Sequence, residues 1–372
     1  MGKIRLLIID DSALIRKVLT EIFNSSDDIE VVGAAEDPIV ARDLIKKLNP
    51  DVLTLDIEMP RMDGLTFLSN LMRLRPMPVV MISTLTEKGA EVTLRALDIG
   101  AVDFVPKPKL DVASSLNDYA EEIIEKVRVA MRAKVKGATK IIQDVKVEPA
   151  CSNKQFKPSI LVSAEKYSVD IILPPASKQY FAKTEKIIAL GASTGGTEAI
   201  KEVVKNLSAN TPAIVISQHL PVAFSASFVK HLDAASPMSA LLAEDGQPIL
   251  PGNIYVAPGD RHLLVVRENG RYICRLNDGP AVNRHKPAVD VMFRSVAQNV
   301  GSNAIGVMLT GMGADGAKSM KEMHDAGAKN IVQNEESSVV WGMPGEAYKL
   351  GAADFVVPLN QIAQQIIKLM TF

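Results

Sequence analysis

Short apolar runs alternate with amphipathic stretches along the first third of the chain. The apolar runs have the length of β-strands, and the stretches between them repeat their apolar positions at helical spacing. Because every strand is followed by a helix, right-handed crossovers predict a parallel sheet with helices on both faces. The expected strands cover residues 4–9, 29–34, 51–56, 78–83 and 102–105, and the expected helices cover residues 13–23, 38–48, 65–74, 88–99 and 114–133.

A second region with the same alternation begins at Lys186. Three runs within it, 253–257, 262–266 and 272–276, are separated by Pro-Gly-Asp and Glu-Asn-Gly turns, which predicts an antiparallel insertion. The remaining pattern predicts a mainly parallel core. Its expected strands cover residues 187–191, 213–217, 304–309 and 330–333, and its expected helices cover residues 196–207, 224–234, 288–299, 314–326, 343–350 and 359–370.

The stretch between the two regions, residues 136–183, loses this periodicity and is punctuated by prolines. We interpret it as an interdomain linker, although residues 159–163 and 169–173 are apolar enough to form a short strand or to dock on a neighbour. The predicted domains are therefore residues 1–135 and 184–372. The predicted fold class is α/β, with an N-terminal flavodoxin-like five-stranded parallel domain and a C-terminal doubly wound domain with an antiparallel hairpin insertion.

The composition of the 372 residues narrows the function further. Hydrophobic residues make up 47% and charged residues 23%, as in soluble globular proteins. Lys and Arg (42) balance Asp and Glu (43), so no basic field exists to attract nucleic acid. The chain has two cysteines, opens directly on a strand-like run, and lacks an apolar stretch of roughly 20 residues. We expect a cytoplasmic, monomeric protein.

Polar residues end the expected strands of the first domain, where an open parallel sheet binds its ligands. They are Asp10, Asp11, Asp56, Ser83 and Lys107. Carboxylates that converge repel one another unless a cation lies among them, and Mg²⁺ suits oxygen ligands. A carboxylate beside Mg²⁺ can accept a phosphoryl group and become an acyl phosphate. Asp56 is the best acceptor because it ends the central strand. The alternative is that single aspartates, such as the one in Asp11-Ser12, only cap the next helix.

A glycine-rich turn, Gly191-Ala-Ser-Thr-Gly-Gly, follows the first strand of the second domain and opens a helix. This setting can expose Ser193 as a nucleophile, although a glycine-rich turn can also bind phosphate. Of the five histidines, His219 alone ends a core strand at the same edge, while His262 and His285 lie where either could reach a cleft. Asp315 follows the strand 304–309, so three strand ends deliver Ser, His and Asp to one crevice. The turn around Met312 offers N–H groups for an oxyanion hole.

The motifs of the first domain resemble those of response-regulator receiver domains. They are Ile-Ile-Asp-Asp-Ser, Leu-Asp-Ile-Glu-Met-Pro-Arg-Met-Asp-Gly and Asp-Phe-Val-Pro-Lys-Pro, within residues 3 to about 125. The resemblance implies that Asp56 is phosphorylated by a histidine kinase, and that Asp10, Asp11, Asp56 and the backbone carbonyl of Glu58 bind Mg²⁺. It implies switch roles for Ser83, Phe104 and Lys107. Thr84 follows Ser83 directly and stays an alternative for the switching hydroxyl.

The motifs of the second domain resemble the chemotaxis protein-glutamate methylesterase family. They are Gly-Ala-Ser-Thr-Gly-Gly, Ser-Gln-His-Leu-Pro, Asn-Arg-His-Lys-Pro-Ala-Val-Asp and Thr-Gly-Met-Gly-Ala-Asp-Gly. The resemblance covers residues 184 to about 370 and implies Ser193, His219 and Asp315 as the triad, with N–H groups of Met312 and Thr194 at the oxyanion. It implies substrate contacts at Arg284 and His285, or else a basic surface loop there. The linker is longer than expected for this family.

This family resemblance also implies an activity and its control. The substrates would be glutamate methyl esters of methyl-accepting chemoreceptors, giving glutamate and methanol, and receptor glutamines that are deamidated. Phosphorylation by the chemotaxis histidine kinase would relieve a blockade of the esterase by the receiver. No cofactor is expected for the esterase, and the membrane is approached only through the receptors.

Two other classes of protein fit the sequence less well. A receiver-controlled transcription factor needs a basic output domain, but residues 184–372 carry 16 Lys and Arg against 17 Asp and Glu. An NAD-binding oxidoreductase needs a G-x-G-x-x-G turn and an acidic residue at the end of the next strand, where Gln218 and His219 stand instead. A hydrolase is the prediction.

Overall fold

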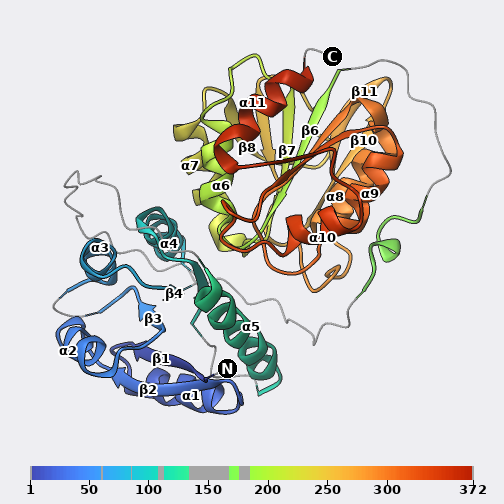
Figure 1. Ribbon diagram of the computed structural model, residues 1–372. Coiled ribbons are helices and arrows are strands. Elements are labelled where there is room, and N and C mark those ends of the chain that lie inside the picture. The colour runs from blue at the N-terminus through green and yellow to red at the C-terminus, as the bar shows by residue number, and fades with distance from the viewer. Residues whose placement is uncertain are drawn as a thin grey trace.

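The computed structural model describes residues 2–59, 62–84, 86–107, 113–133, 167–175 and 185–370. Two α/β domains follow one another along the chain, the first drawn in blue to teal and the second in green to red (Figure 1). Within the described part of the chain, no helix has both the length and the apolar character that a membrane crossing requires.

The first domain contains a five-stranded parallel sheet, as predicted, and its strand order is β2-β1-β3-β4-β5. Polar caps begin its helices: Ser12, Asp37, Asp63 and Thr86 each accept a hydrogen bond from a backbone N–H of the first turn. The strands are β1 (Ile4–Ile9), β2 (Ile29–Ala35), β3 (Val52–Asp56), β4 (Val79–Ser83) and β5 (Asp103–Pro106), and the helices are α1 (Ala13–Asn24), α2 (Pro38–Leu48), α3 (Gly64–Leu74), α4 (Glu87–Ile99) and α5 (Ala113–Arg132).

The second domain contains a seven-stranded parallel sheet in the order β14-β13-β12-β6-β7-β9-β8 and a separate antiparallel hairpin. Every residue of β6 and β7 is buried, because helices cover both faces of the sheet. The sheet strands are β6 (Ile187–Ala192), β7 (Ala213–Gln218), β8 (Ser239–Leu242), β9 (Asn253–Val256), β12 (Ala304–Met308), β13 (Lys329–Gln333) and β14 (Phe355–Val357). The hairpin is β10 (His262–Glu268) and β11 (Arg271–Asn277), and the helices are α6 (Gly196–Val204), α7 (Val222–Ala235), α8 (Val289–Asn299), η2 (Gly301–Asn303), α9 (Ala317–Asp325), α10 (Met343–Lys349) and α11 (Leu359–Met370).

The prediction for the antiparallel insertion was wrong in one strand. Residues 253–257 were expected to belong to it, but β9 pairs in parallel with both β7 and β8. A strand's own pattern of buried residues does not reveal the direction of its partner, so local periodicity could not separate β9 from the hairpin. The short edge strands β8 and β14 were not predicted, because few of their residues are buried.

One described part of the predicted linker docks on the second domain. A short 3₁₀ helix, η1 (Val169–Ile171), packs the buried Val169 into a small apolar cluster with Val282 and Val291. Asp170 forms an ion pair with Arg294 of α8. Residues 167–175 therefore pack against the second domain, whereas the apolar stretch 159–163 lies outside the described residues.

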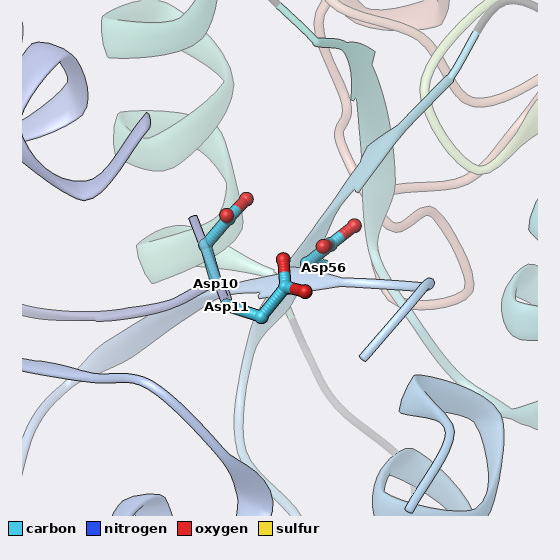
Figure 2. A group of neighbouring side chains, drawn as sticks. All are labelled: Asp10, Asp11 and Asp56. Atoms are coloured by element: carbon cyan, nitrogen blue, oxygen red, sulfur yellow. The ribbon is translucent and has the colours of Figure 1, made fainter. Parts of the chain in front are cut away.

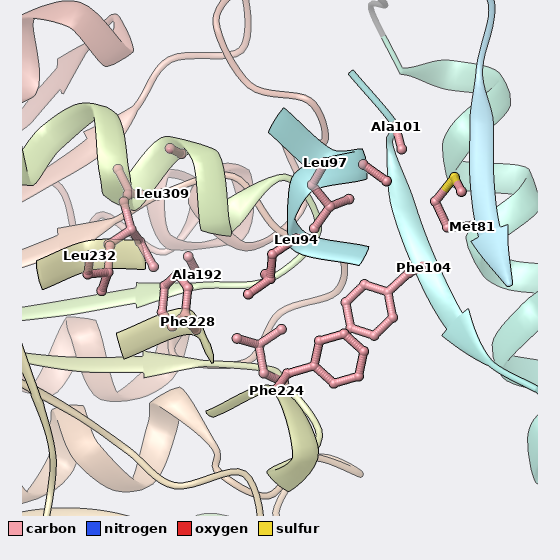
Figure 3. Close-up of a cluster of buried hydrophobic side chains, with 14 of the residues drawn as sticks. Met81, Leu94, Leu97, Ala101, Phe104, Ala192, Phe224, Phe228, Leu232 and Leu309 are labelled. Atoms are coloured by element: carbon pink, nitrogen blue, oxygen red, sulfur yellow. The ribbon is translucent and has the colours of Figure 1, made fainter. Parts of the chain in front are cut away.

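The two domains share an apolar interface. Phe104 of β5 stacks on Phe224 of α7, with ring centroids 4.4 Å apart and an interplanar angle of 23°. Figure 3 shows this pair beside Leu94 and Leu97 of α4 and Phe228 of α7. Side chains of both domains therefore form one continuous core cluster, in which α4 and β5 of the first domain face α7 of the second.

Candidate active site

Ser193 lies on the sharp turn between β6 and α6. Its backbone N–H donates to Thr310 O (3.1 Å), and its carbonyl accepts from Gln218 Nε2 (2.9 Å), so both neighbouring strand ends fix the turn. Gly195 adopts φ +74°, a left-handed conformation, and a Cβ atom there would lie 2.7 Å from the Val339 side chain. Gly195 is therefore needed for a turn that presents the Ser193 hydroxyl.

His219 follows the last residue of β7, the strand next to β6. The Ser193 hydroxyl lies 3.1 Å from Nδ1 of the imidazole, and Nε2 lies 2.8 Å from Asp315 Oδ2. A carboxylate can only accept, so His219 Nε2 carries the proton and Nδ1 is left to accept the hydrogen of Ser193. The arrangement is that of a nucleophile, a base and an orienting acid.

Asp315 is buried, with 3% of its surface exposed, in the loop between β12 and α9. Its Oδ2 also accepts from the N–H of Val289 (2.6 Å), in the first turn of α8, where the helix dipole favours a negative charge. Burial alone would raise the pKa of Asp315, but the hydrogen bond and charge of His219 lower it to about 2. The carboxylate is therefore ionised when His219 takes up a proton.

His285 lies flat against the imidazole of His219. The rings of His219 and His285 have centroids 3.7 Å apart and an interplanar angle of 11°. Burial and the neighbouring His219 lower the pKa of His285, so its ring is neutral near pH 7. Arg284 projects from the same loop and forms an exposed ion pair with Glu121 of α5 (3.2 Å). Of the two predicted contact residues, the structure thus places His285 against His219 and pairs Arg284 with the first domain.

The other histidines have structural surroundings. His262 is buried, its Nε2 lies 2.9 Å from Pro280 O, and its Nδ1 accepts from the N–H of Ala288 (3.2 Å). His231 lies in α7 and His324 in α9. Within the described part of the chain, none of these three contacts Ser193.

Met312 and Thr194, the predicted oxyanion donors, lie in the two loops that meet at Ser193. Met312 follows Gly311, where an added Cβ would lie 2.9 Å from the Ser193 Cβ atom. Among the described residues, no hydrogen-bond acceptor faces the backbone N–H of either Met312 or Thr194. Both donors are therefore available to an oxyanion. The Thr194 hydroxyl, in contrast, donates to Asp103 Oδ2 of the first domain (2.5 Å).

The three aspartates of the first domain meet at the carboxyl end of its sheet (Figure 2). Asp10 and Asp11 follow β1, Asp56 ends β3, and an oxygen of each lies within 4.8 Å of the others. Ser12 rather than Asp11 caps α1, which argues against a mere capping role for Asp11. Lys107 Nζ lies 2.7 Å from Asp56 Oδ2 and 3.5 Å from Asp10 Oδ2.

The electrostatics of this cluster suit a divalent cation. Burial raises the pKa of Asp56 to about 6 against the hydrogen bond from Lys107, and the charge of Asp10 adds to the rise. Asp10 Oδ2 is buried and lacks a hydrogen-bond partner among the described residues. Two crowded carboxylates with an unsatisfied oxygen fit the ligand set that Mg²⁺ prefers.

The predicted switch residues differ in their surroundings. Ser83 is buried at the end of β4, and its hydroxyl accepts from Thr93 Oγ1 (2.6 Å). Thr84 is half-buried one residue further on. Phe104 points away from the cluster into the domain interface, and the side chain of Glu58 is exposed while its N–H donates to Asp56 Oδ1 (3.3 Å).

Three residues near the Ser193 site were missed by the sequence analysis. Asn283 and Asp290 flank Asp315, and Asp103 reaches Thr194 from the first domain. Asn283 and Asp290 do belong to the Asn-Arg-His-Lys-Pro-Ala-Val-Asp motif, which was the available signal. Nothing in the sequence near Asp103 indicated a contact across the domain interface.

One domain contains an acidic cluster of the kind that accepts a phosphoryl group, and the other contains a Ser–His–Asp arrangement. This combination defines a hydrolase linked to a receiver domain. Comparison with known proteins agrees with this class. The response regulator receiver domain matches residues 6–114, and the CheB methylesterase domain matches residues 188–366.

Curated relatives extend over the whole chain. The protein-glutamate methylesterase/protein-glutamine glutaminase of Hydrogenovibrio crunogenus is 56% identical over 379 aligned positions, covering 100% of both chains. Protein-glutamate methylesterase/protein-glutamine glutaminase 1 of Xanthomonas campestris is 54% identical over 98% of this chain and 97% of its own. The solved CheB methylesterase catalytic domain of Thermotoga maritima is 38% identical, with a TM-score of 0.49, over 50% of this chain and 100% of that one. The chain belongs to the CheB methylesterase family, which confirms the resemblance predicted from its motifs.

Proposed function

We propose that the protein is a phosphorylation-activated serine hydrolase that removes methyl groups from glutamate methyl esters of chemoreceptors. The observation that carries this proposal is the pair of distances that join Ser193, His219 and Asp315, at 3.1 and 2.8 Å. These distances connect a hydroxyl nucleophile to a base, and the base to a buried carboxylate. The names of the curated relatives supply the substrate class.

The chemistry follows from the order of these contacts. The Ser193 oxygen attacks the ester carbonyl while its proton moves to His219 Nδ1, and Asp315 stabilises the imidazolium that forms. The backbone N–H groups of Met312 and Thr194 receive the negative oxygen of the tetrahedral intermediate. His219 then protonates the departing methoxide, which leaves as methanol. Water attacks the acyl-enzyme with His219 again as the base, releasing glutamate and restoring Ser193.

Deamidation of receptor glutamines uses the same intermediate. The amide carbonyl is attacked in the same way, but His219 protonates the nitrogen, and ammonia leaves in place of methanol. Both substrates form the same acyl-enzyme on Ser193, and its hydrolysis gives glutamate in both cases. We propose that the two activities share a single site, with Arg284 and His285 contacting the receptor at its rim.

The test is methanol release from membranes that carry methylated receptors, with a serine-directed phosphonate as inhibitor. We expect release by the purified chain, its loss after treatment, and a mass increase on the peptide that contains Ser193. Membranes with unmethylated receptors serve as the control. Methanol release that persists after Ser193 is fully modified would contradict the proposal.

The first domain is proposed to receive a phosphoryl group from the chemotaxis histidine kinase. Asp56 Oδ attacks the phosphorus, and the histidine nitrogen of the kinase leaves, so an acyl phosphate forms. Lys107 neutralises charge beside the acceptor, and Ser83 is positioned to sense the new group, with Thr84 as the alternative. When bound by Asp10, Asp11, Asp56 and the carbonyl of Glu58, Mg²⁺ supplies further charge neutralisation for phosphoryl transfer.

The domain interface supplies a route from Asp56 to the esterase. Phe104 and Asp103 lie on β5, next to the strand that ends in Ser83, and both contact the second domain. Asp103 accepts from the hydroxyl of Thr194, the residue that follows Ser193. We propose that this arrangement is the inhibited state, and that phosphorylation loosens it by moving Phe104 and Asp103.

Replacing Asp103 with alanine is expected to raise the activity of the unphosphorylated protein about 10-fold. Hydrogen bonds to charged groups contribute about 1.5–3 kcal/mol, and losing the one from Thr194 shifts the equilibrium away from the closed arrangement. Methanol release measured with and without a small-molecule phosphodonor checks this. Asp103→Asn keeps a partner for Thr194 and should have a smaller effect. An unchanged unphosphorylated rate in Asp103→Ala would count against the inhibitory contact.

Replacing Asp56 with asparagine is expected to abolish the stimulation by a phosphodonor, because an amide oxygen cannot form the acyl phosphate. The unphosphorylated rate should stay near that of the wild type. Asp63→Asn is the matched control, since Asp63 is an exposed aspartate that caps α3, the next helix after Asp56, and asparagine caps a helix equally well. Stimulation that survives in Asp56→Asn would place the phosphoryl group elsewhere.

A further inference from the structure

The side-chain amide of Asn283 lies between two buried carboxyl groups. Its Nδ2 donates to Asp315 Oδ1 (2.8 Å) and to Asp290 Oδ2 (2.7 Å). Both aspartates are 3% exposed. Within the described part of the chain, Asn283 provides the only side-chain donor to Oδ1 of Asp315, the oxygen that does not face His219.

The orientation of this amide is determined by its surroundings. Each of its two hydrogens has a carboxylate acceptor, and the flipped amide would bring its oxygen against both carboxylates. Asp290 is fixed in turn, because its Oδ1 accepts from the N–H of Ser319 at the start of α9 (3.0 Å). Asp290 therefore holds one side of the amide while Asp315 receives the other.

The backbone of Asn283 is held equally firmly. Asn283 adopts φ +52°, a left-handed conformation that asparagine tolerates better than most residues. Its N–H donates to Tyr167 O (3.0 Å), in the docked segment 167–175. Val282 and His285 exchange backbone hydrogen bonds on either side of it (3.0 and 2.8 Å). The amide thus projects from a loop whose backbone is hydrogen-bonded at and around Asn283.

We propose that Asn283, supported by Asp290, is a positioning residue of the esterase that holds the Asp315 carboxylate in the orientation that receives His219. Without the amide, Asp315 and Asp290 would repel each other across a buried space. The backbone N–H groups of Val289 and Asp290 would then be the remaining donors to the Asp315 carboxylate besides His219 (2.6 and 3.3 Å), and the carboxylate would shift relative to His219 Nε2. Neither Asn283 nor Asp290 touches the reacting atoms, so the effect acts entirely through Asp315. The proposal rests on the proposed function of the Ser193–His219–Asp315 triad.

Loss of the Asn283 amide is expected to slow the chemical step and not to weaken receptor binding. The imidazolium of His219 forms only as Ser193 attacks, so a displaced Asp315 raises the energy of the transition state but not that of bound receptor. A misplacement of about 1 Å at a reacting group can lower the rate about 100-fold. We therefore expect kcat to fall about 10- to 100-fold when the amide is removed, with KM unchanged.

The experiment uses the full chain with a saturating phosphodonor and measures methanol release from methylated receptor membranes. Asn283→Gly removes the amide without backbone strain, because glycine accepts φ +52°. Four proteins form a double-mutant cycle: wild type, Asn283→Gly, Asp315→Ala and the double variant. The expected result is that Asn283→Gly lowers kcat in the wild type but causes no further loss once Asp315 is alanine.

Asn269→Gly is the matched control, because Asn269 has φ +50° in the exposed turn between β10 and β11. It should keep the wild-type rate. Asn283→Asp, nearly identical in shape, presents oxygens to both carboxylates and should lose at least as much activity as Asn283→Gly. Thermal unfolding of each variant, followed by circular dichroism, identifies any variant that fails to fold. If Asn283→Gly does not fold, the rate of Asn283→Asp tests the proposal in its place.

Three outcomes would overturn the assignment of Asn283: an unchanged kcat, a loss confined to KM, or the same fold loss in the Asp315→Ala background. The downfield proton resonance of the His219–Asp315 hydrogen bond gives an independent measure, and its persistence unchanged in Asn283→Gly would contradict the proposal. Full activity of Asp315→Ala alone would instead contradict the triad. The cycle therefore separates failure of this inference from failure of the proposed function.

Discussion

Alanine in place of Ser193 is expected to lower kcat for methanol release about 10⁶-fold, leaving only what binding and the oxyanion donors contribute. The reason is that the Ser193 hydroxyl is the group that His219 Nδ1 contacts, at 3.1 Å. His219 would still be held by Asp315, but it would have no nucleophile to activate. Single-turnover release of methanol from receptor membranes measures the loss without interference from product release.

The neighbouring strand offers a matched control for this substitution. Ser217 is a fully buried serine of β7, and its hydroxyl lacks a hydrogen-bond partner among the described residues. Ser217→Ala therefore removes no contact of the site, and we expect nearly the wild-type rate. A Ser193→Ala protein that releases methanol within 10-fold of the wild type would show that another group, or water alone, attacks the ester.

Most of this site could be predicted from the residues that follow the ends of the expected strands. In parallel sheets the carboxyl ends of neighbouring strands meet at one edge, so Ser193 after β6, His219 after β7 and Asp315 after β12 could be expected to converge. The same rule predicted the meeting of Asp10, Asp56 and Lys107. These expectations need only the order of local elements, which a periodic sequence supplies.

Contacts made by irregular loops or between the two domains could not be predicted from the order of strands and helices. The stacking of His285 on His219 depends on the path of an irregular loop with left-handed residues at 283 and 284. The bond between Thr194 and Asp103 joins residues 91 positions apart on different domains. The prediction for β9 failed for the same reason. Its parallel pairing with β7 and β8 depends on how the whole sheet assembles and cannot be inferred from its own four residues.

Asparagine in place of Asp315 is expected to lower kcat about 10⁴-fold while leaving the fold intact. Asp315 Oδ2 accepts the hydrogen of His219 Nε2, which leaves Nδ1 free to take the proton of Ser193. An asparagine amide can turn its NH₂ group toward Nε2 and so move the imidazole proton to Nδ1. That tautomer points a hydrogen at Ser193 and cannot act as a base. Methanol release with a saturating phosphodonor measures the loss.

The size of this effect distinguishes control of the tautomer from general destabilisation. Asp325→Asn makes the same exchange at an exposed carboxylate of α9 and should leave kcat unchanged, because its ion pair with Lys321 is solvent-exposed. The hydrogen bond and charge of His219 hold the pKa of Asp315 at about 2 despite its burial, so the wild-type carboxylate stays ionised over the working range of pH. We therefore expect the acidic limb of the wild-type pH profile to come from other groups. An Asp315→Asn protein that loses less than 10-fold would mean that His219 acquires the correct tautomer without a carboxylate.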